Sequence, residues 1–162
     1  MLKLFLQKLS SFSRLPVFIQ AWLIPVWVIL GISKILIWAI PFRVLARHLG
    51  AHAGIAALVP ILTWETEVRA TLIGRAIRLA ALYTPWDSNC FPQAIAARVL
   101  LGLYGVPYAV YFGLKRKPES SSLDAHAWVC AGKVSVTGGA SFETFTVVGV
   151  FVSPELLLES DV

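Results

Sequence analysis

The chain has 162 residues and a formal net charge of +5, with 57% hydrophobic and only 14% charged residues. Since a soluble domain ordinarily carries about 25% charged residues, this chain has either a large core for its length or an apolar surface that meets a membrane or a partner protein. The length suits one domain with a core of its own. The basic residues are scattered and form no patch interleaved with aromatic residues, which argues against nucleic-acid binding.

The cysteine and histidine content limits the remaining classes of protein, namely disulfide-rich and metal-binding proteins. Two cysteines, Cys90 and Cys130, are too few for a disulfide framework. The sequence shows no cleavable signal with a small-residue cleavage site, so a cytoplasmic location is the default, with association to a membrane as an open alternative. His48 and His52 are four residues apart, but Gly50 separates them and no third ligand accompanies them. We therefore expect neither a metal site nor a cofactor.

The N-terminal quarter contains a long uncharged run. Residues 15–33 carry no charge, and such a run is about long enough to cross a bilayer as a helix. Pro25 lies in its middle and is expected to kink or split a helix. Three interpretations stay open: a membrane span, a contact with a membrane or a partner protein through residues 15–40, or a helix packed inside the fold. We divide the chain into an apolar helical segment, 1–44, and a domain, 45–162.

Two helices and four strands are predicted in that domain. The first helix, 63–82, has Thr63 as its cap, glutamates in its first turn and arginines later, which suits the helix dipole. The second, 90–104, is apolar nearly all round, as expected of a buried central helix. Segments rich in β-forming residues follow, and they predict strands at 108–114, 125–129, 133–137 and 145–151. Because the connections are short, neighbouring strands are expected to be antiparallel, in an α+β fold.

A cysteine opens the second helix. The segment 86–94 reads WDSNCFPQA, so Ser88 or Asn89 can cap the helix and Pro92 falls in its first turn, where proline costs no intrahelical hydrogen bond. Free backbone N–H groups and the helix dipole favour a thiolate at this position, and only the thiolate attacks well. The same N–H groups could hold the oxyanion of a tetrahedral intermediate.

His126 stands in an alternating segment, 125–129, and shares one strand face with Asp124 and Trp128. A thiol at a helix start and an imidazole on a strand are the minimum set of catalytic groups for a cysteine hydrolase or acyl transferase. Trp128 could then wall the cleft, and Gln93 is a second candidate for lining it. Spacing alone leaves the alternative open that the cysteine is a small buried hydrophobe and the histidine a satisfied polar residue.

The order and spacing of several short motifs resemble the leader peptidases of lasso-peptide biosynthesis, which are small transglutaminase-like cysteine proteases of bacterial natural-product (RiPP) pathways. The resemblance covers roughly residues 35–151. The motifs that carry it are PFR at 41–43, LG at 49–50, WDSNCFPQA at 86–94, GVPY at 105–108, YFG at 111–113, AHAWV at 125–129 and VTGG at 136–139, followed by Phe145.

The resemblance implies a papain/transglutaminase-like α+β fold, with N-terminal helices before a small antiparallel sheet and the nucleophile at the start of the central helix. It implies that Cys90 and His126 cleave one peptide bond and so remove the leader from a ribosomally made precursor. It also implies two partners besides the precursor: a leader-binding protein, here expected to be a separate chain, and an ATP-dependent lasso cyclase.

The sequence departs from the family pattern at the third catalytic group. That group is usually an acidic residue on the strand after the histidine, but no Asp or Glu stands near positions 137–138. The candidates for orienting the histidine or for binding the oxyanion are therefore Thr137, a backbone carbonyl, Asp124, Asp87 and Trp86. The missing acid keeps two alternatives open: an acyltransferase or deamidase on the same fold, and a catalytically inactive, membrane-associated scaffold of a peptide-maturation complex.

Overall fold

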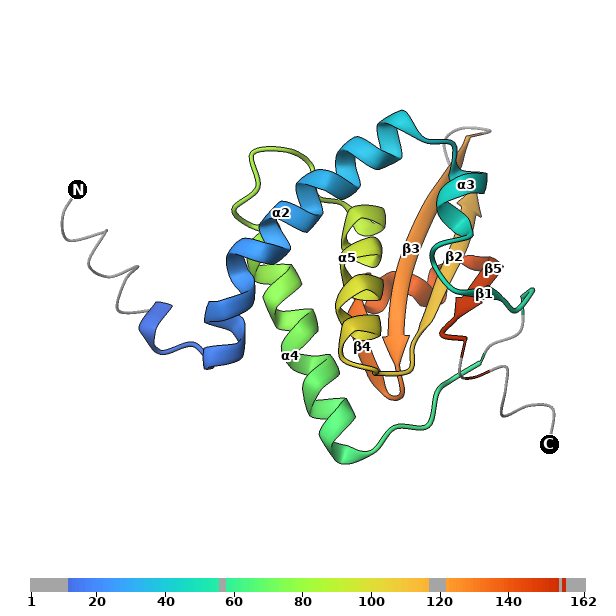
Figure 1. Ribbon diagram of the computed structural model, residues 1–162. Helices are drawn as coiled ribbons and strands as arrows, with labels where there is room; N and C mark the ends of the chain where they lie inside the picture. The colour runs from blue at the N-terminus through green and yellow to red at the C-terminus, as the bar shows by residue number, and fades with distance from the viewer. Residues whose placement is uncertain (1–11, 56–57, 117–121, 155, 157–162) are drawn as a thin grey trace.

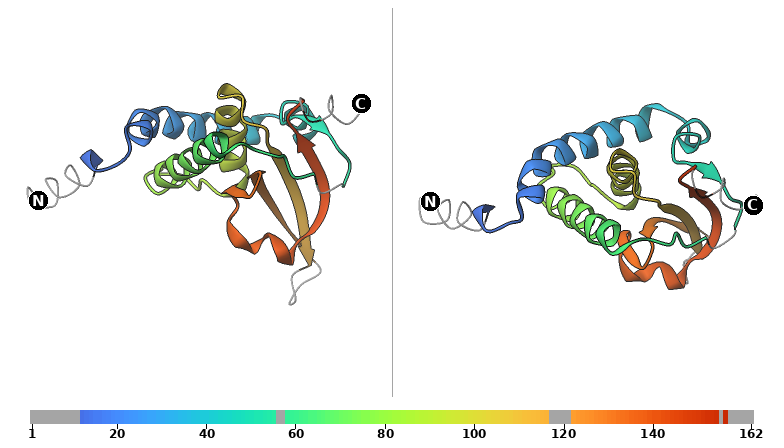
Figure 2. Two further views of the ribbon diagram at one scale, coloured as in Figure 1. Left: turned by 90° about the horizontal axis from the view of Figure 1, so that it is seen from below. Right: turned by 60° about the horizontal axis from the view of Figure 1, so that its bottom comes forward.

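The computed structural model describes residues 12–55, 58–116, 122–154 and 156. In this part of the chain three long helices cover one face of a five-stranded antiparallel sheet, as Figures 1 and 2 show. The predicted α+β class, with N-terminal helices before a small antiparallel sheet, is therefore confirmed.

The uncharged run forms one helix, α2 (Val17–Ala39), which is not split at Pro25. Pro25 is exposed, so the carbonyl that loses its hydrogen-bond partner lies on the side of the helix that water reaches. The opposite side packs on α4 and α5 and buries Ile19, Val26 and Leu30. The segment that we separated at residue 44 thus contributes side chains to the main core.

Helix α4 (Trp64–Ala81) begins as its sequence predicts. The Thr63 side chain accepts a hydrogen bond from the Thr66 amide, at 3.4 Å, which satisfies one of the free N–H groups of the first turn. Gly74 lets the helix approach the sheet, because an added Cβ would lie 2.7 Å from the Val136 carbonyl oxygen. Arg78 donates to that same oxygen at 2.9 Å. Helix α4 is thereby held against the strand that ends beside the candidate site.

The sheet has the order β1-β5-β2-β3-β4, and every pairing is antiparallel. All four predicted strands are present within two residues of their expected bounds, and β2 and β3 are longer than expected because their pairing extends beyond the alternating residues. The sequence analysis missed β1 and a 3₁₀ helix, since both are too short to show a period. The bounds are β1 (Ala51–His52), β2 (Ala109–Arg116), β3 (Leu123–Ala131), β4 (Val134–Thr137), the 3₁₀ helix η1 (Gly139–Thr144) and β5 (Thr146–Val152).

Helix α5 (Cys90–Leu103) lies between the other helices and the sheet, and it packs against α2, α4 and β3. Its buried residues include Ala94, Ala97 and Leu101, which join the core that also contains Val129 of β3. Since this helix is apolar on nearly every side, it must be central, as predicted. A short helix, α3 (Phe42–Ala46), follows α2 and approaches the sheet at the end where α5 begins.

Candidate active site

The first turn of α5 carries Cys90, a partly buried free thiol. Asn89 occupies the cap position, although its side chain makes no cap hydrogen bond. The Gln93 side chain instead ties this turn to the preceding loop by donating to the Ser88 carbonyl at 2.6 Å. The first amides of a helix have no intrahelical acceptor, and Pro92 has no N–H to offer. The amides of Cys90 and Phe91 are therefore the donors that this turn can present to an anion.

His126 lies on β3 near the end of β4. Its Nε2 is 2.8 Å from the Gly138 carbonyl oxygen, which can only accept a hydrogen bond, so Nε2 carries the proton. The imidazole also stacks on Phe145, with ring centroids 5.0 Å apart. These two contacts fix the orientation of the ring and leave Nδ1 as the nitrogen that can accept a proton.

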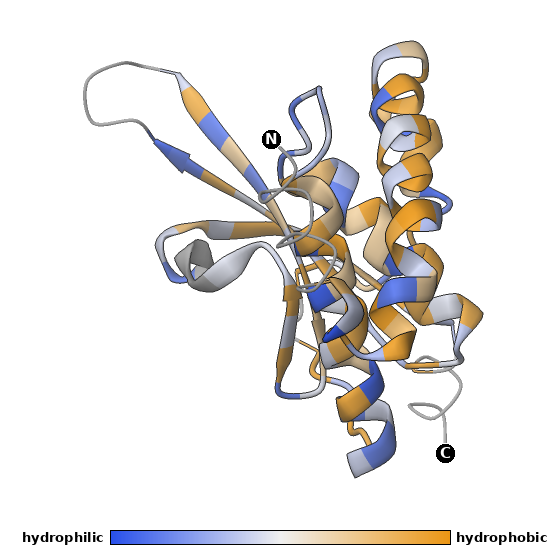
Figure 3. Cartoon of the chain, turned by 90° about the vertical axis from the view of Figure 1, so that its left-hand side faces the viewer, coloured by the Kyte–Doolittle hydropathy of each residue, from blue (hydrophilic) through white to orange (hydrophobic). Residues whose placement is uncertain are grey.

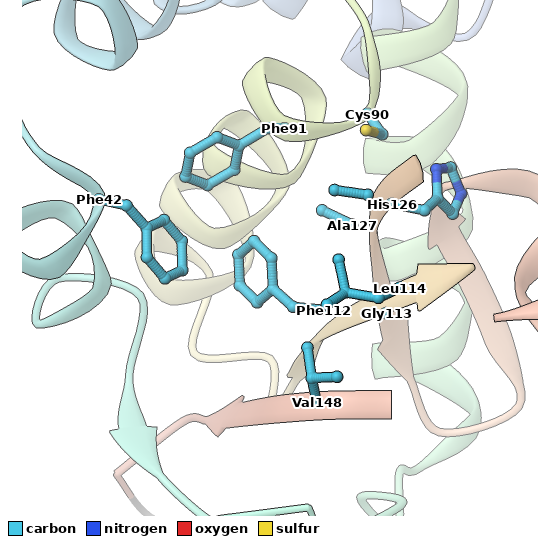
Figure 4. Close-up of a pocket in the computed structure, with 10 residues that line it drawn as sticks. Phe42, Cys90, Phe91, Phe112, Gly113, Leu114, His126, Ala127 and Val148 are labelled. Carbon is cyan, nitrogen blue, oxygen red and sulfur yellow. The ribbon is translucent and has the colours of Figure 1, made fainter. Parts of the chain in front are cut away.

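Cys90 and His126 line the same pocket, which has a volume of about 320 Å³ and is shown in Figure 4. The remaining walls are apolar. They consist of Phe42, Phe91, Phe112, Gly113, Leu114, Ala125, Ala127 and Val148. The structure thus brings together a thiol from a helix start and an imidazole from a strand, far apart in the sequence. Proton transfer between them stays a prediction.

The four candidates for an orienting or oxyanion group lie outside this pocket's lining. Asp124 and Asp87 are exposed, and Asp124 faces Lys115 across the β2–β3 pair. Thr137 is buried at the end of β4, and its hydroxyl has no hydrogen-bond partner among the described residues. The indole Nε1 of Trp86 is likewise buried without a partner in the described part of the chain. Its ring packs against that of Trp27 in a tilted arrangement, with a centroid distance of 4.8 Å.

The two residues predicted to line the cleft support it from behind. Trp128 is 3% exposed and stacks on Tyr111, with centroids 5.5 Å apart and planes inclined by only 7°. Its ring centroid is also 6.0 Å from that of His126. Gln93 is used in the hydrogen bond to Ser88. Neither side chain lines the pocket, so the cleft walls come from residues that the sequence analysis did not select.

Three aromatic rings that sequence reasoning missed form one side of the pocket. Phe42 from α3 lies 5.7 Å from Phe91 and 5.1 Å from Phe112, measured between ring centroids. Phe91 and Phe112 are 5.5 Å apart. All three rings belong to motifs that carry the family resemblance, but only Phe91 adjoins the cysteine in the sequence. The folded topology brings Phe42 and Phe112 to the same place.

A scan against protein-family models matches residues 36–150 to the transglutaminase-like superfamily. The chain belongs to the transglutaminase-like superfamily. Searches among curated proteins and among solved structures gave no significant match. The match covers α3, α4 and α5, strands β1 to β4 and most of β5, and it includes Cys90 and His126.

Members of the transglutaminase-like superfamily are generally Cys–His hydrolases or peptidases, and this indicates cysteine hydrolase or peptidase chemistry here. The geometry agrees with what such chemistry needs: a thiol at a helix start, an imidazole in the same pocket, and a fixed acceptor that holds the imidazole tautomer. In this chain the fixed acceptor is a backbone carbonyl, that of Gly138, at the position where the family pattern usually has an acid.

The two thiols should differ sharply in reactivity. Burial raises the pKa of Cys130, so less of this thiol ionises near neutral pH, and the thiolate is the species that alkylates. Cys90 lines the open pocket at a helix start. We expect iodoacetamide at neutral pH to label Cys90 at least about tenfold faster than Cys130, as measured by peptide mapping with mass spectrometry. Equal labelling of both residues in the folded protein would contradict this assignment.

Proposed function

We propose that this protein is a cysteine peptidase that removes the leader from a ribosomally made lasso-peptide precursor. The observation that carries the proposal is the pocket that Cys90 and His126 share, with the imidazole held through Nε2 by the Gly138 carbonyl. The motif order described above supplies the substrate class, and membership of the superfamily supports peptide hydrolysis.

The reaction begins at the pocket with the Cys90 thiol giving its proton to Nδ1 of His126. The thiolate attacks the scissile carbonyl carbon and forms a C–S bond, while the carbonyl oxygen becomes an oxyanion close to the amides of Cys90 and Phe91. The imidazolium then protonates the departing core nitrogen, and the C–N bond breaks. The leader is now held as a thioester, and the core leaves with a free N-terminus.

Water completes the cycle. His126 takes a proton from the water as it attacks the thioester carbonyl, the C–S bond breaks, and the leader departs with a new carboxylate. The Gly138 carbonyl has the orienting role that an acidic side chain has in the family pattern. It keeps the proton on Nε2 and so leaves Nδ1 free to accept the proton of Cys90. A neutral acceptor stabilises the imidazolium less than a carboxylate does, which favours a slow enzyme.

The apolar pocket suggests how the substrate is held. Its size is within the range of about 300 to 1,000 Å³ that small ligands occupy, and it accommodates one large apolar side chain next to the reacting thiol. We propose that a residue flanking the cleaved bond enters it and contacts Phe42, because Phe42 is 49% exposed and packs on both of the other rings.

Replacing Phe42 with alanine should therefore weaken substrate binding more than chemistry. We expect KM to rise roughly five- to tenfold and kcat to change less than about twofold, because the ring contacts the substrate side chain in the ground state and the transition state alike. Steady-state kinetics with the precursor would show this. Trp64→Ala is the matched control, since Trp64 is an exposed aromatic residue at the start of α4, and it should leave both constants unchanged.

The deciding experiment mixes the full chain with a precursor peptide and a leader-binding protein and follows leader release by mass spectrometry. The expected products are a leader with a free carboxylate and a core with a free amine. A parallel reaction with a small added amine distinguishes acyl transfer, because an amide of the leader with that amine has a different mass. Amide as the main product would replace the peptidase proposal with the acyltransferase alternative.

We further propose that the leader-binding protein and the ATP-dependent cyclase are separate partners. The apolar helix α2 ends directly before α3, whose Phe42 lines the pocket. A precursor carried by a second protein can reach the pocket from this side, and the released core can pass to the cyclase. Omission of the leader-binding protein should slow release of the leader without abolishing it, which the same mass-spectrometric assay measures.

A further inference from the structure

The outer face of α2 is an uncovered apolar stripe. Its members are spaced by three, four or seven residues, which places them on one side of a helix. They are Val17, Ile24, Val28, Ile32, Ile35 and Trp38, with exposed fractions of 80, 75, 44, 51, 64 and 89% respectively. In Figure 3 the colours of hydrophobic residues predominate along this helix. A contiguous apolar surface of this length is unusual in water and marks a binding surface.

The inner face of α2 is committed to the fold. Val26 and Leu30 are fully buried, and Trp22 donates through Nε1 to the Tyr104 hydroxyl at 2.7 Å. Trp27 donates to the Tyr83 carbonyl at 3.1 Å. The helix is long and apolar enough to cross a membrane by length and composition. Insertion of α2 across a membrane would break these contacts with the rest of the domain. In the folded protein the helix therefore exposes the stripe along its side while its inner face stays packed.

The charged residues that flank the two ends of the stripe are basic. Residues 1–64 contain six basic residues and no acidic residue. Arg14 precedes α2, and Arg43 and Arg47 follow it in and after α3, all three exposed. Asp87 is an exposed acidic residue whose neighbour, Trp86, packs on Trp27 of α2. Cations at both ends of an apolar stripe favour an anionic surface.

We propose that α2 docks on an anionic lipid bilayer and lies in the plane of the interface, with the stripe inserted and its inner face still packed on the domain. The residues fit this occupant: aliphatic side chains enter the acyl region, Trp38 sits at the level of the headgroups, and Arg43 and Arg47 contact the phosphates. A protein interface of this size ordinarily has a polar rim with hydrogen-bonding groups, whereas this stripe consists of apolar side chains along its whole length.

The consequence concerns the orientation of the candidate active site. Phe42 lines the pocket and comes three residues after the last residue of α2. A bilayer under α2 therefore lies close to the mouth of the pocket, and a membrane-bound enzyme would meet its peptide substrate at the membrane surface. Docking itself does not depend on the proposed peptidase activity, since it is measured without substrate.

The test is cosedimentation of the full chain with lipid vesicles, either of phosphatidylcholine alone or of phosphatidylcholine mixed with phosphatidylglycerol. We expect binding to the anionic vesicles, weakened by added salt. The triple substitution Ile24→Gln, Ile35→Gln and Trp38→Gln should lower the partition coefficient by roughly a hundredfold, because three apolar side chains no longer enter the lipid. Ile61→Gln is the matched control, since Ile61 is 96% exposed but precedes α4, and it should bind as the wild type does.

Two results would overturn the proposal: a wild-type protein that stays in the supernatant with both vesicle types at low salt, or a triple variant that sediments like the wild type. Light scattering tests the alternative occupant, a second copy of the chain. If the wild type self-associates but does not bind vesicles, and the triple variant no longer self-associates, the stripe is a protein interface. If the triple variant failed to fold, the single substitution Trp38→Gln would make the same comparison with an expected loss of about tenfold.

Discussion

Leader release is expected to stop when Cys90 is replaced by alanine. The thiol forms the covalent bond to the substrate, and removing the nucleophile from a catalytic unit typically costs several orders of magnitude in rate. We expect a fall of roughly ten-thousandfold or more in kcat, with uncleaved precursor accumulating in the mass spectrum. Since Cys90 is only partly buried at a helix start, the free energy of unfolding should change by less than about 1 kcal/mol.

Three further variants make this result specific. His126→Ala should reduce the rate to a similar level, and the double variant should be hardly worse than either single one, because the two side chains act as one unit. Cys130→Ala is the control for loss of a thiol, since Cys130 does not line the pocket and packs instead against a second buried cluster that contains Tyr111 and Trp128, and it should retain activity. Leader release by Cys90→Ala at the wild-type rate would contradict the assignment of Cys90 as the nucleophile.

The helices could be predicted because their signals are local. Thr63, the glutamates of the first turn and the later arginines define α4 from the sequence alone, and the structure places its start within one residue of the prediction. Helix α5 was recognisable from its continuous apolar composition and its position before Gly105. β1 was missed because two residues show no period, and only pairing with β5 makes them a strand.

The orientation of α2 could not be predicted from composition. A run without charges fits a span, a surface helix and a buried helix equally well, because all three remove apolar side chains from water. What separates them is the pairing of particular residues across the fold, such as Trp22 with Tyr104 and Trp27 with Trp86. These contacts join segments more than fifty residues apart, and nothing in the local sequence predicts them.

The candidate site was predictable in its chemistry but not in its walls. A cysteine at a helix start has a local signature, whereas the rings that line the pocket come from α3, α5 and β2. The sequence left Thr137, a backbone carbonyl, Asp124, Asp87 and Trp86 as candidates for the orienting group. In the structure the Gly138 carbonyl contacts the imidazole, and every residue has a carbonyl, so residue type could not identify which one.

Replacing Gly138 with alanine is expected to disable the site through its geometry. Gly138 has φ = +93°, a conformation that L residues rarely adopt, and an added Cβ would collide with the Trp128 side chain. The turn must shift, and with it the carbonyl that accepts from His126 Nε2. We expect kcat to fall on the order of a hundredfold or more, as happens when a histidine loses the partner that fixes its tautomer. The free energy of unfolding should fall by about 2 to 4 kcal/mol.

Gly139→Ala separates backbone strain from displacement of the carbonyl. Gly139 also has a positive φ, +65°, but nothing lies within 4 Å of the Cβ that would be added. This variant should lose about 1 kcal/mol of stability and keep most of its activity. Chemical denaturation and leader-release kinetics measure both quantities. Because the two glycines are neighbours with the same kind of backbone strain, an equal loss of activity in both variants would show that the Gly138 carbonyl does not orient the histidine. A loss confined to Gly138→Ala would assign to a backbone oxygen the role that an acidic side chain has in most members of the superfamily.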